Sequence, residues 1–145
     1  MIEAEYTIYQ AIAAGDTAFV TSYLSNGGDP NQFEQSGWTL LMCAVEYENK
    51  EMIDLLIANG ADINYQEAGG WTALHQAVDL SIDGTIQTGG APGDEPVDML
   101  AYLLDRGADV HITDSKGESP MDIATSYTSE KIVRFLKEYL PASPE

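Results

Sequence analysis

Side chains that could do chemistry are plentiful in this chain but are not spaced for it. Its 145 residues include 24 Asp and Glu, 2 His and 1 Cys. Carboxylates this abundant form pairs by composition alone, so no pair points to general acid–base catalysis. His75 and His111 lie far from each other and from Cys43 in the sequence, which is not the spacing of metal ligands. We therefore expect no enzyme activity, no metal and no cofactor.

Two short segments resemble ligand-binding loops without meeting their requirements. Asp79, Asp83 and Gly84 lack the alternating oxygen ligands and the closing Glu of a calcium loop. Residues 89–93 are rich in glycine, but no Lys and no phosphate-facing helix pattern follows, so they do not form a phosphate-binding loop. Weak calcium binding by the acidic segment around Asp83 remains an alternative.

A short phrase recurs along the chain and indicates how it is built. It reads Gly-Ala-Asp-Ile-Asn at 60–64, Gly-Ala-Asp-Val-His at 107–111 and, more loosely, Gly-Gly-Asp-Pro-Asn at 27–31. Each copy is followed, a few residues later, by a tripeptide in which the first residue is Gly and the third is Thr or Ser. The repeat distance is 33 residues, both from Gly27 to Gly60 and from Thr39 to Thr72. A unit of this period cannot bury its apolar face alone, so neighbouring units must stack.

Each unit is predicted to hold two helices between two turns. Thr39 can cap the first helix of its unit through its side-chain oxygen, and Gly60 can end the second in a left-handed conformation. The first unit has Tyr6 where the capping Thr belongs. We expect one domain over 1–140, with units at 1–33, 34–66, 67–113 and 114–140, and a tail at 141–145.

The third unit is longer than the period by 14 residues. Its first-helix pattern continues to about Leu80 and its second-helix pattern resumes near Val97, so the extra length is placed at 81–96. Several Gly and Pro residues predict a loop there. Loops of this length are either functional or disordered, and both interpretations stay open.

The net charge of −18 narrows the range of partners. Residues 1–105 contain 17 acidic residues and a single base, Lys50. The negative electrostatic potential of so many acidic residues repels nucleic acid and anionic lipid surfaces. It favours fast, salt-sensitive binding of cationic proteins. The alternative is that acidity serves only solubility or suits a salty cytoplasm.

Other features bear on location. Cys43 cannot form an internal disulfide and is expected to be a small core residue. No stretch approaches the roughly 18 apolar residues of a membrane span, and the N-terminus is acidic where a secretory signal would be basic. These features predict a cytoplasmic protein, which we expect to be monomeric.

Three segments resemble the ankyrin repeat: Thr72-Ala73-Leu74-His75-x-Ala77, Leu103-Leu104-x-x-Gly107-Ala108-Asp109, and the exit phrase from Leu55 to Asn64. The resemblance implies an all-α solenoid of about four helix-turn-helix repeats with β-turn fingertips. It implies binding of other proteins, with no characteristic catalytic residue or cofactor. It also implies that His75 braces the turns through hydrogen bonds, and His111 is expected to do the same.

The resemblance implies that partners contact the fingertips and the ends of the first helices. Trp38 and Trp71 share one fingertip position, where each ring either anchors a partner or packs over the neighbouring turn. Gln35, Ser36 and Ser126 hold corresponding positions. The full set of predicted partner-binding residues is Trp38, Trp71, Glu46, Tyr47, Asp79, Leu80, Asp83, Asp94, Glu95, Glu118 and Tyr127.

These observations predict a non-catalytic module that binds and inhibits a basic partner, as an immunity or antitoxin-like protein neutralises a toxin or nuclease. One alternative is a general scaffold or regulatory adaptor whose affinity depends little on salt. Another is an accessory or weak calcium-binding protein that uses the acidic insert. Binding is expected to be lost on Trp71→Ala, or on neutralising Asp79, Asp83, Asp94 and Glu95 together.

Overall fold

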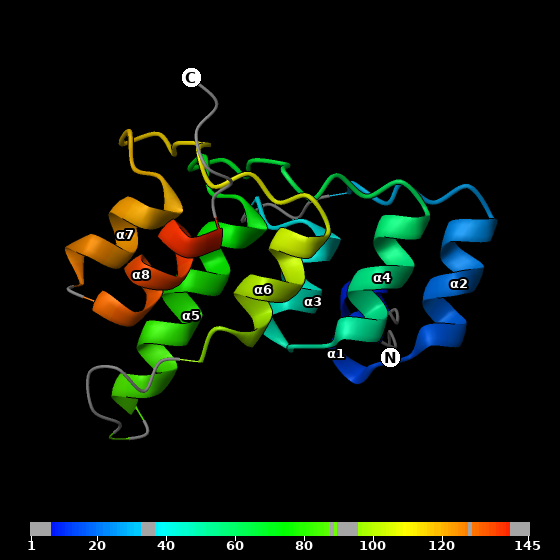
Figure 1. Ribbon diagram of the computed structural model, residues 1–145. Coiled ribbons are helices and arrows are strands. Elements are labelled where there is room, and N and C mark those ends of the chain that lie inside the picture. Colours follow the sequence, from blue (N-terminus) through cyan, green and yellow to red (C-terminus); the bar gives the residue numbers. More distant parts are fainter. Residues whose placement is uncertain (1–6, 33–36, 88, 90–95, 128, 140–145) are drawn as a thin grey trace, which may run out of the picture.

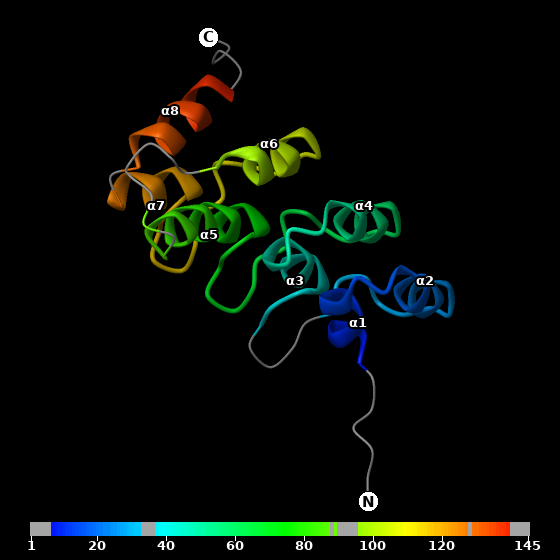
Figure 2. The same cartoon turned by 90° about the horizontal axis from the view of Figure 1, so that it is seen from below.

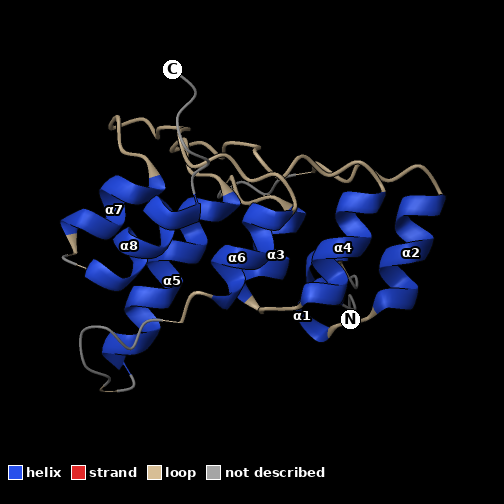
Figure 3. Cartoon of the chain, in the orientation of Figure 1, coloured by secondary structure: helices blue, strands red, loops and turns tan. Residues whose placement is uncertain are grey.

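The chain folds into pairs of helices joined by turns (Figures 1 and 3). The structure is a computed structural model that describes residues 7–32, 37–87, 89, 96–127 and 129–139. The helices in this part of the chain are α1 (Ile8–Ala14), α2 (Thr17–Ser25), α3 (Leu40–Glu46), α4 (Lys50–Ala58), α5 (Ala73–Gln87), α6 (Asp98–Asp105), α7 (Pro120–Ser126) and α8 (Glu130–Tyr139).

The pairs stack side by side in two layers, as Figure 2 shows. The first helices α1, α3, α5 and α7 form one layer, in which each contacts the next, and α2, α4, α6 and α8 form the other. The turns that lead from one pair to the next all lie at the same end of the helices (Figure 1). The predicted all-α solenoid is confirmed.

The core runs through the whole stack, because every pair buries one face against its neighbours. Ile12, Leu56, Leu74, Leu103 and Leu136, taken from all four pairs, are each 0% exposed. Burying a side chain of this size contributes about 2 kcal/mol, so stability is spread along the array rather than concentrated in one unit. Cys43 is buried in this core, as predicted.

Side-chain caps fix where the first helices begin. The hydroxyl of Thr39 accepts a hydrogen bond from the Met42 N–H at 3.2 Å, and Ser119 caps α7 in the same way. In the first unit Thr7 forms a capping box with Gln10. The prediction that Tyr6 replaces the capping residue is therefore wrong. The cap lies one residue later than the 33-residue period requires, and a cap needs only the local geometry of the first turn.

The loop predicted at 81–96 is shorter than expected, because α5 continues through Gly84 to Gln87. A glycine inside a helix costs about 1 kcal/mol. Here Ile82, Ser81 and Thr85 are all buried, and the burial of Ile82 offsets that cost. The prediction of a loop is thus wrong over 81–87, while residues 88 and 90–95 lie outside the described residues.

Asparagines tie consecutive exit turns together. The Asn64 side chain donates to the Gly107 carbonyl at 3.2 Å and accepts from the Asp109 N–H at 2.8 Å. Asn31 joins the preceding turns in the same way. His111 holds the next equivalent position, but its side chain is exposed and makes no hydrogen bond to any described residue. The brace predicted for His111 is therefore not formed with any residue that the structure describes.

A charged cluster joins the second layer across two units. Arg106 Nε lies 2.5 Å from Asp54 Oδ1, and the Tyr102 hydroxyl donates to the same carboxylate. The Arg106 guanidinium stacks 3.4 Å from the centre of the Tyr102 ring. The hydrogen bond from Arg106, followed by that from Tyr102, holds the pKa of Asp54 below its usual value. The cluster therefore braces α4 against α6.

Glu48 adopts a strained backbone conformation in the turn between α3 and α4. Its φ of 52° lies in the left-handed region, where Gly15 stands in the first unit, immediately before the cap of the second helix. This conformation costs a non-glycine residue about 1 kcal/mol or more. We expect Glu48→Gly to raise the free energy of unfolding by about 1 kcal/mol in urea titrations. A decrease would show that the Glu48 side chain stabilises the turn.

Candidate functional site

Two hollows occupy equivalent places on the layer of first helices, beside the turns that open each unit. The first hollow, between α1 and α3, has a volume of about 350 Å³ and is lined by Tyr9, Trp38, Glu46 and Tyr47 among others. Three of the predicted binding residues, Trp38, Glu46 and Tyr47, are therefore brought together there.

The second hollow lies between α5 and α7 and has a volume of about 510 Å³. It gathers four of the predicted binding residues, Trp71, Asp79, Glu118 and Tyr127. Ser126 lines it as well. Glu67 and Asp114 add their carboxylates, against a single cationic side chain, Lys116. The second hollow is thus both aromatic and strongly acidic.

Trp71 is held in place by the following unit. Its indole Nε1–H donates to Asp114 Oδ2 at 3.1 Å, and its ring stacks on His75 with centres 6.1 Å apart and an angle of 18° between the planes. The ring packs against the core and is half-buried. Trp71 therefore packs over the neighbouring turn while still lining the second hollow. Trp38 is half-buried too.

His75 braces two units from inside the core. Its side chain is 0% exposed, and its Nδ1 accepts from the Thr72 N–H at 3.1 Å. The ring hydrogen therefore lies on Nε2, which donates to the Glu118 carbonyl 2.9 Å away. The bracing role predicted for His75 is confirmed, and it fixes the turn that carries Glu118.

Asp114 organises the rim of the second hollow, and sequence reasoning missed it. Its side chain accepts from the backbone N–H groups of Lys116 and Glu118, each at 2.9 Å, as well as from Trp71. Burial acts to raise the Asp114 pKa, but these hydrogen bonds outweigh burial and hold it below its usual value. Asp114 is thus an ionised anchor whose hydrogen-bonding capacity is used within the fold.

A sequence signal for Asp114 did exist. An acidic residue stands five positions before the capping Thr or Ser in three units, as Glu34, Glu67 and Asp114. Glu67 uses its carboxylate similarly, accepting from the Trp71 N–H at 2.9 Å. The recurring acid therefore marks the fingertip turn, although Glu34 lies outside the described residues.

Asp79 differs from Asp114 because its carboxylate is unsatisfied. Half-buried on α5, it has no hydrogen bond or cation among the described residues. Burial, followed by the nearby charge of Asp83, raises its pKa. A cation that enters the second hollow would relieve both effects, so Asp79 is suited to meet a positively charged group.

The raised pKa of Asp79 gives a prediction about stability. The folded state holds this proton more tightly than the unfolded chain, so ionised Asp79 opposes folding at neutral pH. We expect Asp79→Asn to stabilise the protein at pH 7, and the gain to vanish as the pH falls below 3.8, the ordinary value. Thermal melts across this range measure the effect. Glu51→Gln, which removes an exposed carboxylate of α4, corrects for the change in net charge.

Two tyrosines provide exposed aromatic surface on the layer of first helices, beside the first and second hollows. Tyr47 and Tyr127 occupy the same position at the C-terminal ends of α3 and α7, and each is 54% exposed. In the longer α5 this position is Leu80, which lies within the helix and lines a different hollow, between α5 and α6. The structure therefore separates Leu80 from the other predicted contacts.

The predicted acidic insert is only partly described. Asp83 is exposed on α5, whereas Asp94 and Glu95 lie outside the described residues, as do Gln35 and Ser36. In the described part of the chain, no three or more His, Cys, Asp and Glu side chains gather where they could hold a metal ion. Within the same residues, none of the helices has the length and apolar character of a membrane span.

Comparisons with known proteins agree with this architecture. A family model described as ankyrin repeats in three copies matches residues 8–87, and one described as ankyrin repeats in many copies matches residues 91–136. The chain is 36% identical over 55 residues to the ankyrin repeat, SAM and basic leucine zipper domain-containing protein 1 of Notamacropus eugenii. That match covers 38% of this chain and 12% of the relative. Ankyrin repeats are protein–protein interaction modules and are generally non-catalytic. With a family model matching more than half of its length, the chain belongs to the ankyrin repeat family.

Proposed function

We propose that this ankyrin repeat protein binds a basic partner protein through the second hollow and its exposed rim. The observation that carries the proposal is the gathering of four carboxylates and two aromatic rings against one ammonium group. Charge of this sign steers a cationic partner, and a half-exposed aromatic such as Tyr127 provides contact area for a Lys or Arg side chain.

Within the second hollow the residues divide into a frame and a contact set. Asp114 and Trp71 are joined to each other and to the neighbouring turns, so they form the frame. Asp79 and Tyr127 make no hydrogen bond through their side chains to a described residue, so they are free to meet a partner. The first hollow offers a second, more aromatic contact, in which Glu46 is the one carboxylate of the lining beside Tyr47.

We further propose that binding neutralises the partner, in the manner of an immunity or antitoxin-like inhibitor of a toxin or nuclease. The charge of −18 on a chain of 145 residues supports this, because an enzyme that acts on a polyanion carries a basic active surface. An acidic protein bound to that surface then covers the groups that the substrate needs.

The test uses the double variant Asp79→Asn/Glu118→Gln and the single variant Tyr127→Ala. Proteins captured from a lysate of the native host are eluted with rising salt, and the affinity of the main one is measured for each variant. We expect a basic protein whose binding weakens about tenfold or more with each variant. Glu51→Gln/Glu138→Gln, which removes the same charge from exposed positions on α4 and α8, serves as the matched control.

The outcomes separate the proposals. A partner whose affinity ignores salt and both variants would indicate a general scaffold, and it would overturn the basic-partner proposal. A basic partner that binds through the second hollow but keeps its own activity in the complex would overturn only neutralisation. Tyr127→Ala is preferred to Trp71→Ala, because Trp71 also packs against the core and its loss would disturb the fold.

A further inference from the structure

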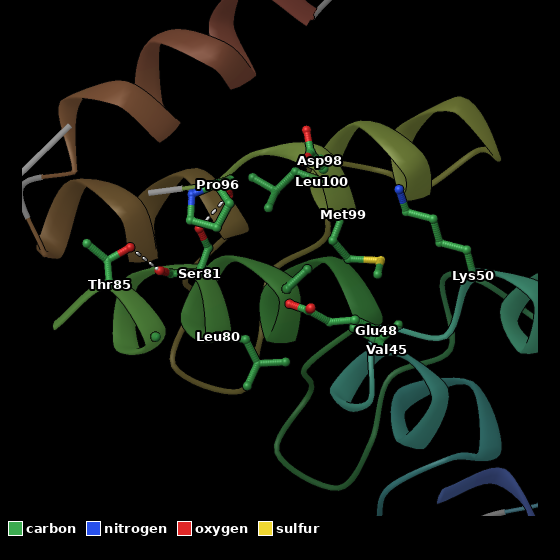
Figure 4. Close-up of a pocket in the computed structure, with 12 residues that line it drawn as sticks. Val45, Glu48, Lys50, Leu80, Ser81, Thr85, Pro96, Asp98, Met99 and Leu100 are labelled. Atoms are coloured by element: carbon green, nitrogen blue, oxygen red, sulfur yellow. Dashed lines mark hydrogen bonds between the residues drawn. The ribbon is translucent and has the colours of Figure 1, made fainter. Parts of the chain in front are cut away.

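A third hollow, larger than the other two, opens on a different part of the molecule. It has a volume of about 840 Å³ and lies between the turn after α3, the later part of α5 and the start of α6 (Figure 4). Its lining is mainly apolar and includes Val45, Leu80, Pro96, Met99 and Leu100. It shares no lining residue with the first or second hollow.

The continuation of α5 builds the third hollow. The Ser81 hydroxyl donates to the Pro96 carbonyl at 2.5 Å, and the Thr85 hydroxyl donates to the Ser81 carbonyl at 2.9 Å (Figure 4). Because both hydroxyls are used within the protein, they offer little to a ligand. Gly84 also lines the hollow, and a Cβ added there would meet nothing within 4 Å. The helix therefore leaves an open, apolar surface at this place.

The charged groups that line the third hollow are two carboxylates, Glu48 and Asp98, and one ammonium group, Lys50. In Figure 4 the Glu48 carboxylate points toward α5, into the hollow, whereas the Asp98 carboxylate points away from it. The Lys50 ammonium lies against α6, 5.2 Å from the centre of the Tyr102 ring. Glu48 reaches its position from the strained turn in which the first unit has Gly15. An exposed acidic group thus stands beside the apolar lining of the hollow, although a glycine would fit the backbone better.

We propose that the third hollow binds a short segment of a partner protein in which apolar side chains stand next to a lysine or arginine. A volume of about 840 Å³ lies within the range of ligand pockets and accommodates several side chains. The methylene stem of the basic residue packs on Leu80 and Met99 while its charged end meets Glu48. Unlike the acidic second hollow, this site requires apolar and basic groups together.

The test uses acetylated, amidated hexapeptides that contain three leucines and three arginines in every order. Binding to the full chain is measured by calorimetry at physiological ionic strength. We expect at least one peptide to bind, and Glu48→Gln to weaken it about tenfold, the value of one charge-assisted contact. Met99→Ser should weaken it as well. Matched peptides in which serine replaces leucine should not bind.

Two controls distinguish loss of peptide binding at the third hollow from loss of folding and from a change in net charge elsewhere. Glu48→Gly removes the same carboxylate while relieving the strained turn, so it should weaken the peptide and leave the protein at least as stable. Glu51→Gln and Glu138→Gln remove one charge each at exposed positions outside the third hollow, and they should leave the affinity unchanged. Equal binding of the serine peptides, no binding by any peptide, or sensitivity to Asp79→Asn instead of Glu48→Gln would overturn the proposal. Sensitivity to Asp79→Asn would place the peptides in the second hollow, and the other outcomes concern the third hollow alone.

Discussion

Replacing Leu74 with alanine is expected to lower the free energy of unfolding by about 3 kcal/mol, a typical cost for a fully buried leucine. Leu74 is 0% exposed in α5, and α5 packs against α3, α6 and α7. A cavity at this position therefore weakens the contacts of the third unit with the units on both sides. In a stacked array, stability is approximately the sum of unit and interface contributions, so a central site affects more of that sum than a terminal one.

The matched control is Leu24→Ala in α2, where the leucine is only partly buried in the terminal unit. It should lower the free energy of unfolding by about 1 kcal/mol, because less buried apolar area is lost and the space left by the side chain is open to solvent. Urea unfolding followed by circular dichroism measures both variants. Equal losses for Leu74→Ala and Leu24→Ala would contradict a continuous core centred on α5.

What the sequence predicted well depends on local chemistry. The start of α3 at Leu40 follows from a Thr that caps its own helix, and the ends of α2, α4 and α6 follow from the repeated exit phrase. The brace at His75 belongs to the same repeated pattern. These features are short-range, so a period of 33 residues was enough to place them along the chain.

What the sequence did not predict depends on contacts between units. Glycine at position 84 favours a loop, but the burial of Ile82 decides in favour of a helix, and that burial exists only once α5 has neighbours. Leu80 had the correct register for the binding face, yet the longer helix places it on another hollow. The bond between Trp71 and Asp114 joins residues 43 positions apart, so no local pattern revealed that the ring is part of the frame.

Replacing Asp114 with alanine is expected to cost about 2 kcal/mol at pH 7, as three hydrogen bonds to one ionised group are lost. The pKa of Asp114 is lower in the folded state than its ordinary value of 3.8, so its contribution is fully present above pH 3.8. The contribution disappears as the pH falls through the lowered value, because protonation removes the charge that the N–H groups stabilise. The difference between wild type and Asp114→Ala should therefore shrink in acid.

Asp62→Ala provides the control, since this exposed carboxylate accepts only the N–H of Asn64 among the described residues and should cost well under half as much. Urea titrations at pH 7 and at progressively lower pH measure both variants, and a loss at Asp114 that is independent of pH would contradict an ionised anchor. The same variant bears on binding, because Asp114 holds Trp71 and the turn of Glu118 at the rim of the second hollow. If the hollow binds a basic partner, Asp114→Ala must weaken that partner even though its own carboxylate is occupied within the fold. An unchanged affinity would mean that the partner contacts the array elsewhere.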